Sequence, residues 1–309
     1  MMQMDLSTSL SFIYWVGGIL NIIILIVGFL GNACTIYILC QSQFRRSIFY
    51  NLIICLACFD TVCLLSFGSA ITFKSFIDER YLVTIRTVTY TLQLFGLGGS
   101  IYTTVAISLE RYLGVCHSMN RWKRTVWIYF IPVTIIDLIL LTPPGIYMIC
   151  VPNENYFRLS WVFYEALVFY WVIPLLSITV LNGLIVIDLR KPTIILDAQQ
   201  QHRSRTVHIL LWIVFVYFCC LVIPALVGAC FIYFFCVDSA EGISMIRSVA
   251  YVAININSSV NIIIYCYVGE NFRKEILKML LNQKKPSQMS LPRLQHKVMM
   301  PNKLPFKTS

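Results

Sequence analysis

Seven long apolar stretches constrain what this chain can fold into. An apolar segment of about 17–25 residues can cross the hydrocarbon core of a bilayer as a helix. The stretches, which short connections separate, are Leu6–Phe44, Ser47–Phe73, Thr87–Leu109, Thr125–Asn153, Leu159–Ile187, Thr206–Val237 and Ser248–Gly269. They predict an all-α membrane protein in which residues 12–268 form a seven-transmembrane helix bundle.

The composition excludes an ordinary soluble enzyme. Of the 309 residues, 58% are hydrophobic and 12% are charged, whereas about 25% of an average soluble domain is charged. Most of the 12 cysteines lie inside apolar stretches, and no cysteines and histidines have the spacing of a zinc cluster. The sequence also lacks a nucleophile beside a base and a phosphate-binding glycine loop, so we expect no enzymatic activity.

The basic residues predict the orientation of the bundle. Cytoplasmic loops of membrane proteins carry an excess of Lys and Arg. If the amino terminus lies outside, 19 of the 24 Lys and Arg face the cytoplasm. We therefore expect a multi-pass protein of the plasma membrane with an extracellular amino terminus and a cytoplasmic carboxyl terminus. Because the basic groups face one leaflet, they favour contacts with anionic membrane lipids and an acidic partner over binding to nucleic acid.

Three segments lie outside the predicted bundle. Residues 1–11 are expected to form a short extracellular amino terminus. Residues 269–282 predict an amphipathic helix on the membrane surface, because Phe272, Ile276 and Leu280 recur at helical spacing with basic residues between them. Residues 283–309 contain Pro, Lys and Ser and few apolar residues, which predicts a disordered cytoplasmic tail.

Polar residues within the apolar stretches predict a small polar cavity inside the bundle. They are Asp60, Ser100, Asn257 and Asn261. Such groups are costly in hydrocarbon unless they are paired or hydrated. A carboxylate with neutral oxygen donors and water suits a sodium ion. A network of hydrogen bonds between helices would use the same residues without an ion, and the sequence leaves both interpretations open.

An acidic and a basic residue stand side by side at the inner end of the third stretch, in Glu110-Arg111-Tyr112. In a partly desolvated position the two side chains can form an ion pair, and breaking this pair would expose the guanidinium of Arg111 to a partner. On spacing alone, an anchor for the helix at the membrane boundary is the more ordinary role for two such charges. Both a switch and an anchor fit the spacing.

Several short motifs occur in one order along the seven stretches. They are Gly31-Asn32, Leu56-Ala57-Cys58-Phe59-Asp60, Glu110-Arg111-Tyr112, Pro174, Pro224, Asn261-Ile262-Ile263-Ile264-Tyr265 and Phe272-Arg273. Together they resemble the rhodopsin-like (class A) G-protein-coupled receptors over about residues 12–282. Further segments are similar to the invertebrate FMRFamide-type neuropeptide receptors, namely Gly99–Ala106, Gly114–His117, Leu181-Asn182, Phe218–Pro224 and Asn257–Asn261.

The resemblance implies a role for each matching residue. The sodium and water site would be formed by Asp60, Ser100, Asn257 and Asn261. The switch for G-protein coupling would comprise Glu110, Arg111, Tyr112, Asn261 and Tyr265, with Arg111 contacting the G protein and Tyr265 swinging inward. Helix bends that transmit ligand binding would lie at Pro174, Phe218 and Pro224. A proline in a spanning helix also produces a static packing kink, so the hinge role stays open.

The sequence departs from the family pattern at its outer face. Arg86 stands where similar receptors carry a cysteine that forms a disulfide with the second outer loop, and residues 151–160 contain no cysteine. The remaining candidates near the outer end are Cys150, Cys230 and Cys236, which the sequence does not pair. Ile262 also replaces the usual seventh-helix proline.

The outer half of the bundle is the expected ligand pocket. The residues expected at similar depths in the membrane on the third, fifth, sixth and seventh stretches are Gln93, Leu94, Leu97, Phe163, Ala166, Ala225, Ala229, Arg247, Tyr251 and Asn255. Gln93 stands where amine receptors carry Asp, which disfavours a small protonated amine. An amidated peptide ending in Arg-Phe would need an acidic partner for its Arg and an aromatic pocket for its Phe. Acids on the outer rim, such as Glu154 and Asp238, would supply that partner, although a solvated outer face fits them equally well.

These features predict a receptor that binds an extracellular ligand, a short amidated FMRFamide-like neuropeptide, and activates a heterotrimeric G protein. The tail has few hydroxyl groups for phosphorylation-dependent binding of arrestin. An alternative is a chemosensory receptor of the same fold for an environmental small molecule. A further alternative is an ion channel or carrier that uses Asp60 and Asp137, although the chain shows no internal repeat of the kind found in transporters.

Overall fold

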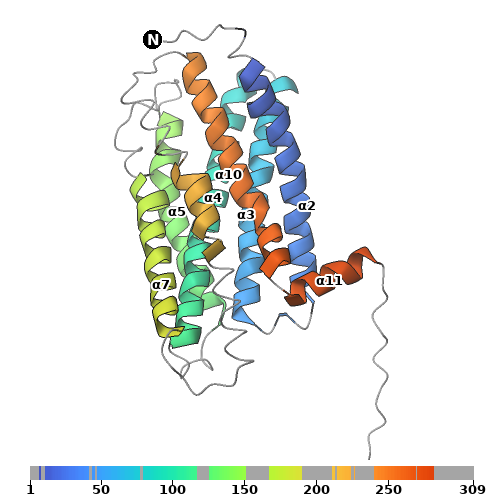
Figure 1. The fold of residues 1–309 in the computed structure, drawn as a ribbon. Helices are drawn as coiled ribbons and strands as arrows, with labels where there is room; N and C mark the ends of the chain where they lie inside the picture. Colours follow the sequence, from blue (N-terminus) through green and yellow to red (C-terminus); the bar gives the residue numbers. More distant parts are fainter. Residues whose placement is uncertain are drawn as a thin grey trace, which may run out of the picture.

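The computed structural model describes most of the predicted bundle. It describes residues 7, 11–41, 44–45, 47–76, 79–116, 125–150, 167–189, 211–212, 214–223, 226, 240–268 and 270–281. Within these ranges every regular element is a helix (Figure 1). The predicted amino-terminal segment and the predicted tail lie largely or wholly outside the described residues.

The helices follow the order of the apolar stretches. They are η1 (Ile13–Leu20), α2 (Asn21–Leu39), α3 (Ile48–Phe76), α4 (Glu79–Cys116), α5 (Trp127–Cys150), η4 (Leu167–Val172), α7 (Ile173–Leu189), η5 (Phe218–Val222), α10 (Ala240–Val268) and α11 (Glu270–Leu280). The η elements are π-helical turns. In the described residues, five helices are long and apolar enough to span a membrane, and Trp127–Leu141, the first part of α5, counts as a shorter apolar helix. The sixth predicted stretch is described only around η5.

Helix α4 lies at the centre of the bundle. It packs against α3, α5 and α7, while α2 packs between α3 and α10 (Figure 1). A close approach of α3 and α4 depends on Gly96, because a Cβ atom at this residue would lie 2.5 Å from the backbone nitrogen of Cys63. A Cβ atom on Gly99 would overlap the ring of Phe59. Small residues allow this close packing where no hydrophobic effect drives membrane helices together.

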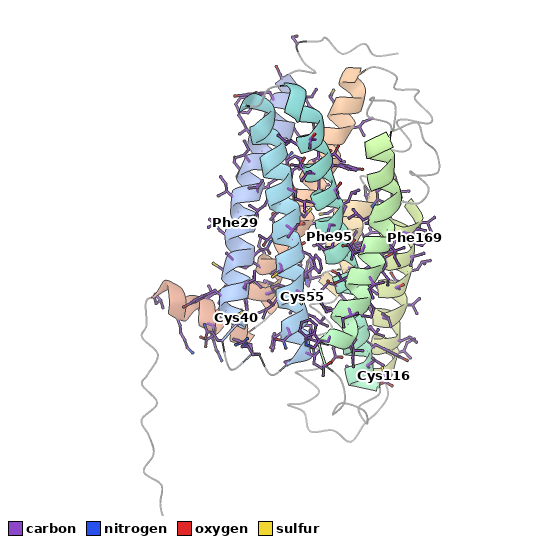
Figure 2. The ribbon with its side chains drawn as sticks, turned by 180° about the vertical axis from the view of Figure 1, so that it is seen from behind. Phe29, Cys40, Cys55, Phe95, Cys116 and Phe169 are labelled. Atoms are coloured by element: carbon purple, nitrogen blue, oxygen red, sulfur yellow. The ribbon has the colours of Figure 1, made fainter. Side chains whose placement is uncertain are left out.

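The distribution of apolar side chains is that of a protein surrounded by lipid. Large apolar residues such as Ile23, Leu30, Ile139 and Leu176 are exposed, whereas Asn32, Asp60 and Asp137 are fully or almost fully buried. Figure 2 shows the side chains around the bundle, with Phe29 on the outer face of α2. Lipid solvates apolar groups, and polar groups must find partners inside. The described helices thus have the surface expected of helices surrounded by lipid.

Helix α11 leaves the end of α10 and turns away from the bundle (Figure 1). Its apolar residue Phe272 is buried and makes an edge contact with Tyr265 of α10, with ring centroids 5.9 Å apart. Arg273, Lys274 and Lys278 are exposed. The helix therefore has the two faces that the sequence pattern predicts, and its position on the inner membrane surface stays a prediction.

Candidate functional site

A buried carboxylate at Asp60 joins three helices. The hydroxyl of Ser100 on α4 donates a hydrogen bond of 2.7 Å to Oδ1, and Nδ2 of Asn261 on α10 donates one of 2.8 Å to Oδ2. Asp60, in the middle of α3, is completely buried. Each carboxylate oxygen thus has a donor, as a buried charged group requires. The structure brings together three residues that the sequence predicted would share a polar site.

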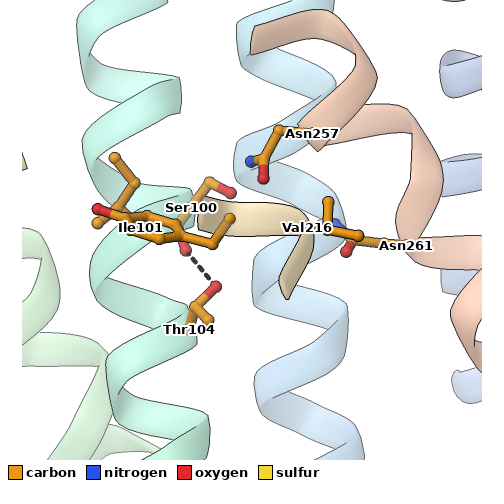
Figure 3. A pocket seen from close by; sticks show the side chains of 7 residues that line it. Ser100, Ile101, Thr104, Val216, Asn257 and Asn261 are labelled. Atoms are coloured by element: carbon orange, nitrogen blue, oxygen red, sulfur yellow. Dashed lines mark hydrogen bonds between the residues drawn. The ribbon is translucent and has the colours of Figure 1, made fainter. Parts of the chain in front are cut away.

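A small cavity lies beside this centre. Its volume is about 10 Å³, close to the space that one water molecule needs. Ser100 and Thr104 of α4 lie on one side, and Asn257 and Asn261 of α10 lie on the other (Figure 3). The cavity is also lined by Ile101, Val216 and Tyr217. Asn257, the fourth predicted residue, is thus in the same cavity as Ser100 and Asn261.

The chemistry of this centre fits a small monovalent cation. When ionised, Asp60 supplies a negative charge, while Ser100 and the amides of Asn257 and Asn261 supply neutral oxygens. Oxygen ligands of this kind suit hard cations. Thr104 donates its hydroxyl to the backbone carbonyl oxygen of Ser100 (3.0 Å; Figure 3). The hydroxyl of Ser100 is separately hydrogen-bonded to Asp60. The donor set therefore agrees with a sodium and water site, whose occupation stays a proposal.

Buried asparagines connect α2 to α10. Nδ2 of Asn32 donates to the carbonyl oxygen of Ser258 (3.1 Å), and Nδ2 of Asn255 donates to Oδ1 of Asn21 (2.8 Å). At the start of α2, Asn21 also donates to the carbonyl oxygen of Gly17 in η1 (3.2 Å). Asn255, a predicted residue of the ligand pocket, is completely buried and bonded to α2. Asn21 was missed, although an amide within an apolar stretch is itself a signal.

The predicted switch residues contact aromatic side chains of neighbouring helices. The hydroxyl of Tyr129 on α5 donates a hydrogen bond to Oε2 of Glu110. The guanidinium carbon of Arg111 lies 3.3 Å from the centre of the Phe49 ring on α3. Sequence reasoning missed both Tyr129 and Phe49, because neither lies near Glu110 or Arg111 in the chain. Tyr265 is buried in α10, and its hydroxyl makes no hydrogen bond within the described residues.

A π-helical turn precedes Pro174 on α7. Pro174 is buried and has no N–H group for the carbonyl oxygen of Tyr170. The hydroxyl of Tyr217 donates to that oxygen (2.6 Å), and the hydroxyl of Tyr102 on α4 donates to the carbonyl oxygen of Phe169 (2.8 Å). Phe218 is exposed in η5, and Pro224 lies outside the described residues. The predicted hinge at Pro174 therefore follows a π-helical turn whose carbonyl oxygens accept hydrogen bonds from tyrosines elsewhere in the bundle.

The predicted ligand pocket is described only in part. Gln93 and Leu97 are buried in α4, Leu94 is half-buried, and Tyr251 packs on Phe67 with ring centroids 4.8 Å apart. The amide nitrogen of Gln93 has no hydrogen-bond partner within the described residues. Residues Phe163, Ala166, Ala225 and Ala229 lie outside the described residues, as do the side chains of Arg247 and of Cys150, Cys230 and Cys236.

The sequence matches a family model over much of the bundle. The family is "7 transmembrane receptor (rhodopsin family)", and residues 31–265 match it. The chain therefore belongs to the rhodopsin family of seven-transmembrane receptors, the class A G-protein-coupled receptors. It is a multi-pass membrane protein, and proteins of this family are signalling receptors and not enzymes.

Known receptors are similar to the chain along most of its length. A FMRFamide receptor of Drosophila melanogaster is 27% identical over 88% of this chain and 55% of its own length. C-X-C chemokine receptor type 1 of Mus musculus is 30% identical over 62% of the chain and 59% of its own length. C-C chemokine receptor type 1 of Macaca fascicularis is 23% identical over 83% of the chain and 77% of its own length. The chain thus spans little more than half the length of the first two.

Proposed function

We propose that this receptor resides in the plasma membrane with its amino terminus outside, and that it binds a short amidated, FMRFamide-like peptide and activates a heterotrimeric G protein. The observation that carries the proposal is the similarity to a FMRFamide receptor over 88% of the chain. The other two relatives are named for chemokines, so none of the three is named for a small amine. Membrane lipids and arrestin are further proposed partners.

The chemistry around Gln93 supports a peptide ligand. Gln93 is buried in α4 and has no carboxylate with which to hold a protonated amine. Its amide nitrogen makes no hydrogen bond within the described residues. An amide N–H can donate to a peptide carbonyl oxygen, and a buried donor gains most from such a partner. We propose that Gln93, with Leu94, Leu97 and Tyr251, contributes to the ligand pocket.

Activation is a shift between two packings of the same helices. In the structure, Asp60 connects α3 to α4 and α10, and Tyr265 and Phe272 connect α10 to α11. A peptide that binds one packing better moves the population toward it. We propose that Arg111 contacts the G protein in the second packing, and that Tyr265 moves inward to give its hydroxyl a partner. Ligand and G protein must then raise each other's affinity equally.

A sodium ion would stabilise the resting packing. We propose that Asp60, Ser100, Asn257 and Asn261 hold it. When bound, the ion supplies a positive charge that balances the carboxylate of Asp60 inside the membrane. The protein residues hold Asp60 in place with or without the ion, since Ser100 and Asn261 each donate a hydrogen bond to it.

The proposal is tested in cells that express the chain and receive a library of amidated peptides, with calcium and cAMP as readouts. We expect a response to peptides ending in Arg-Phe-amide that is lost in Arg111→Ala and retained in Arg45→Ala, which removes an exposed basic residue. A response that survives Arg111→Ala would show that Arg111 is not the coupling residue. Silence across the library, with surface expression confirmed, would contradict the peptide ligand and favour a chemosensory receptor.

A further inference from the structure

The guanidinium of Arg111 lies directly over an aromatic ring. Its carbon Cζ is 3.3 Å from the centre of the Phe49 ring, which is only 5% exposed. A cation within about 6 Å of the centre of a ring is attracted to the negative face of that ring, and more strongly when both groups are removed from water. The contact joins the inner end of α4 to the first turn of α3.

The Phe49 ring is fixed in place by its surroundings. Tyr50 makes an edge contact with Phe49 (5.4 Å between centroids) and another with Phe44 (5.1 Å). The preceding turn is closed by backbone hydrogen bonds from Phe44 to Gln41 (3.0 Å) and from Ser47 to Phe44 (3.1 Å). Because the Phe49 ring is already ordered by this packing, it loses little further side-chain entropy when Arg111 contacts its face.

The acidic neighbour of Arg111 is engaged from a different helix. Glu110 accepts a hydrogen bond from Tyr129 of α5, and Tyr129 is buried. The two adjacent charges are thus contacted from opposite neighbours, α3 and α5.

We propose that Phe49 is a positioning residue for G-protein coupling, whose ring holds the guanidinium of Arg111 in the resting packing. This inference rests on the proposed role of Arg111 in contacting the G protein. Weakening the contact releases Arg111 and raises signalling in the absence of any ligand. The expected rise in basal activity is about 2- to 30-fold, which is the change in an equilibrium constant that a cation–π contact of ordinary strength produces.

Fluorination of the ring tests this contact directly. The full chain is made with one, two or three fluorine atoms on Phe49, and basal nucleotide exchange on a heterotrimeric G protein is measured in membranes. Fluorine withdraws electron density from the face of the ring while changing its size little. We expect exchange to rise in steps with the number of fluorines. The matched control is the same series at Phe59, a buried ring that stacks on Phe130. The proposal would be overturned if basal nucleotide exchange did not change with the number of fluorines on Phe49, or if it rose equally with fluorines on Phe59.

Conventional substitutions give a second measurement. Phe49→Leu keeps an apolar side chain but removes the aromatic face, so basal exchange should rise, while Phe49→Trp, which has the stronger ring, should keep it at or below the level of the unmodified chain. A rise of equal size in both variants would indicate a packing defect and overturn the proposal.

A spectroscopic readout separates the contact from the proposed function. The ¹⁹F resonance of a fluorinated Phe49 should move in Arg111→Gln and stay in place in Arg45→Gln, whether or not the chain couples to a G protein. If no variant stimulated nucleotide exchange on the G protein but the resonance still moved in Arg111→Gln, the result would contradict G-protein coupling and support the contact. An unmoved resonance in Arg111→Gln would overturn the contact itself.

Discussion

The hydroxyl of Tyr217 donates a 2.6 Å hydrogen bond to the carbonyl oxygen of Tyr170, four residues before Pro174. In a regular helix that oxygen would accept from residue 174, which as proline has no N–H group. Tyr217 immediately precedes η5 and also lines the cavity beside Asn257 and Asn261. One side chain therefore joins the π-helical turn before α7 to the polar centre of the bundle.

Removing this hydroxyl should destabilise the receptor. Tyr217→Phe leaves the carbonyl oxygen of Tyr170 without its side-chain donor, at an expected cost of about 1 kcal/mol, since interhelical hydrogen bonds in membranes average about 0.6 and reach about 1.7 kcal/mol. The melting temperature in lipid nanodiscs should fall. The control Tyr267→Phe removes an exposed hydroxyl and should leave the melting temperature unchanged. Equal effects of the two substitutions would contradict the assigned role.

Sodium should raise the melting temperature of the unmodified protein. A ligand that binds only the folded state stabilises it by RT ln(1 + [L]/Kd), which is about 1.4 kcal/mol at tenfold excess over Kd. Exchanging sodium for choline in the buffer removes this effect. Asp60→Asn removes the charge that holds the ion, so its melting temperature should not depend on which of the two cations is present. Sodium dependence that persists in Asp60→Asn would place the ion elsewhere.

Substitution of Gly96 should separate α3 from α4. A Cβ atom there would lie 2.5 Å from the backbone nitrogen of Cys63 and 2.8 Å from its Cα atom. Because backbone cannot move aside as a flexible side chain can, Gly96→Ala should cost about 1–3 kcal/mol and lower both surface expression and melting temperature. Among the described residues, nothing lies within 4 Å of a Cβ atom placed on Gly114 of the same helix, so Gly114→Ala should be neutral or slightly stabilising.

The amide pair of Asn21 and Asn255 should behave as one unit. The single substitutions Asn21→Ala and Asn255→Ala, together with the double variant, form a double-mutant cycle of melting free energies. We expect a coupling energy of about 0.6–1.7 kcal/mol, as measured for hydrogen bonds between membrane helices. Strictly additive effects would show that the 2.8 Å hydrogen bond contributes nothing to the association of α2 with α10.

The sequence by itself determined the class of the protein and the members of its polar centre. Hydrophobic length is a local property, so the apolar stretches could be found without knowing how they pack. A carboxylate or amide inside such a stretch must find a partner in the bundle. That reasoning singled out Asp60, Ser100 and Asn261, and the structure joins them by hydrogen bonds.

Only the tertiary structure decided which partners the remaining polar groups have. Phe49 contacts Arg111, Tyr129 contacts Glu110, and Asn255 pairs with Asn21. These partners are far apart in the chain, and each pairing depends on how two helices are rotated and shifted along their axes. In lipid all faces of a spanning helix can be apolar, so the sequence pattern does not mark the face that turns inward. Close contacts between small residues and hydrogen bonds set the rotation, and both arise only when the helices pack.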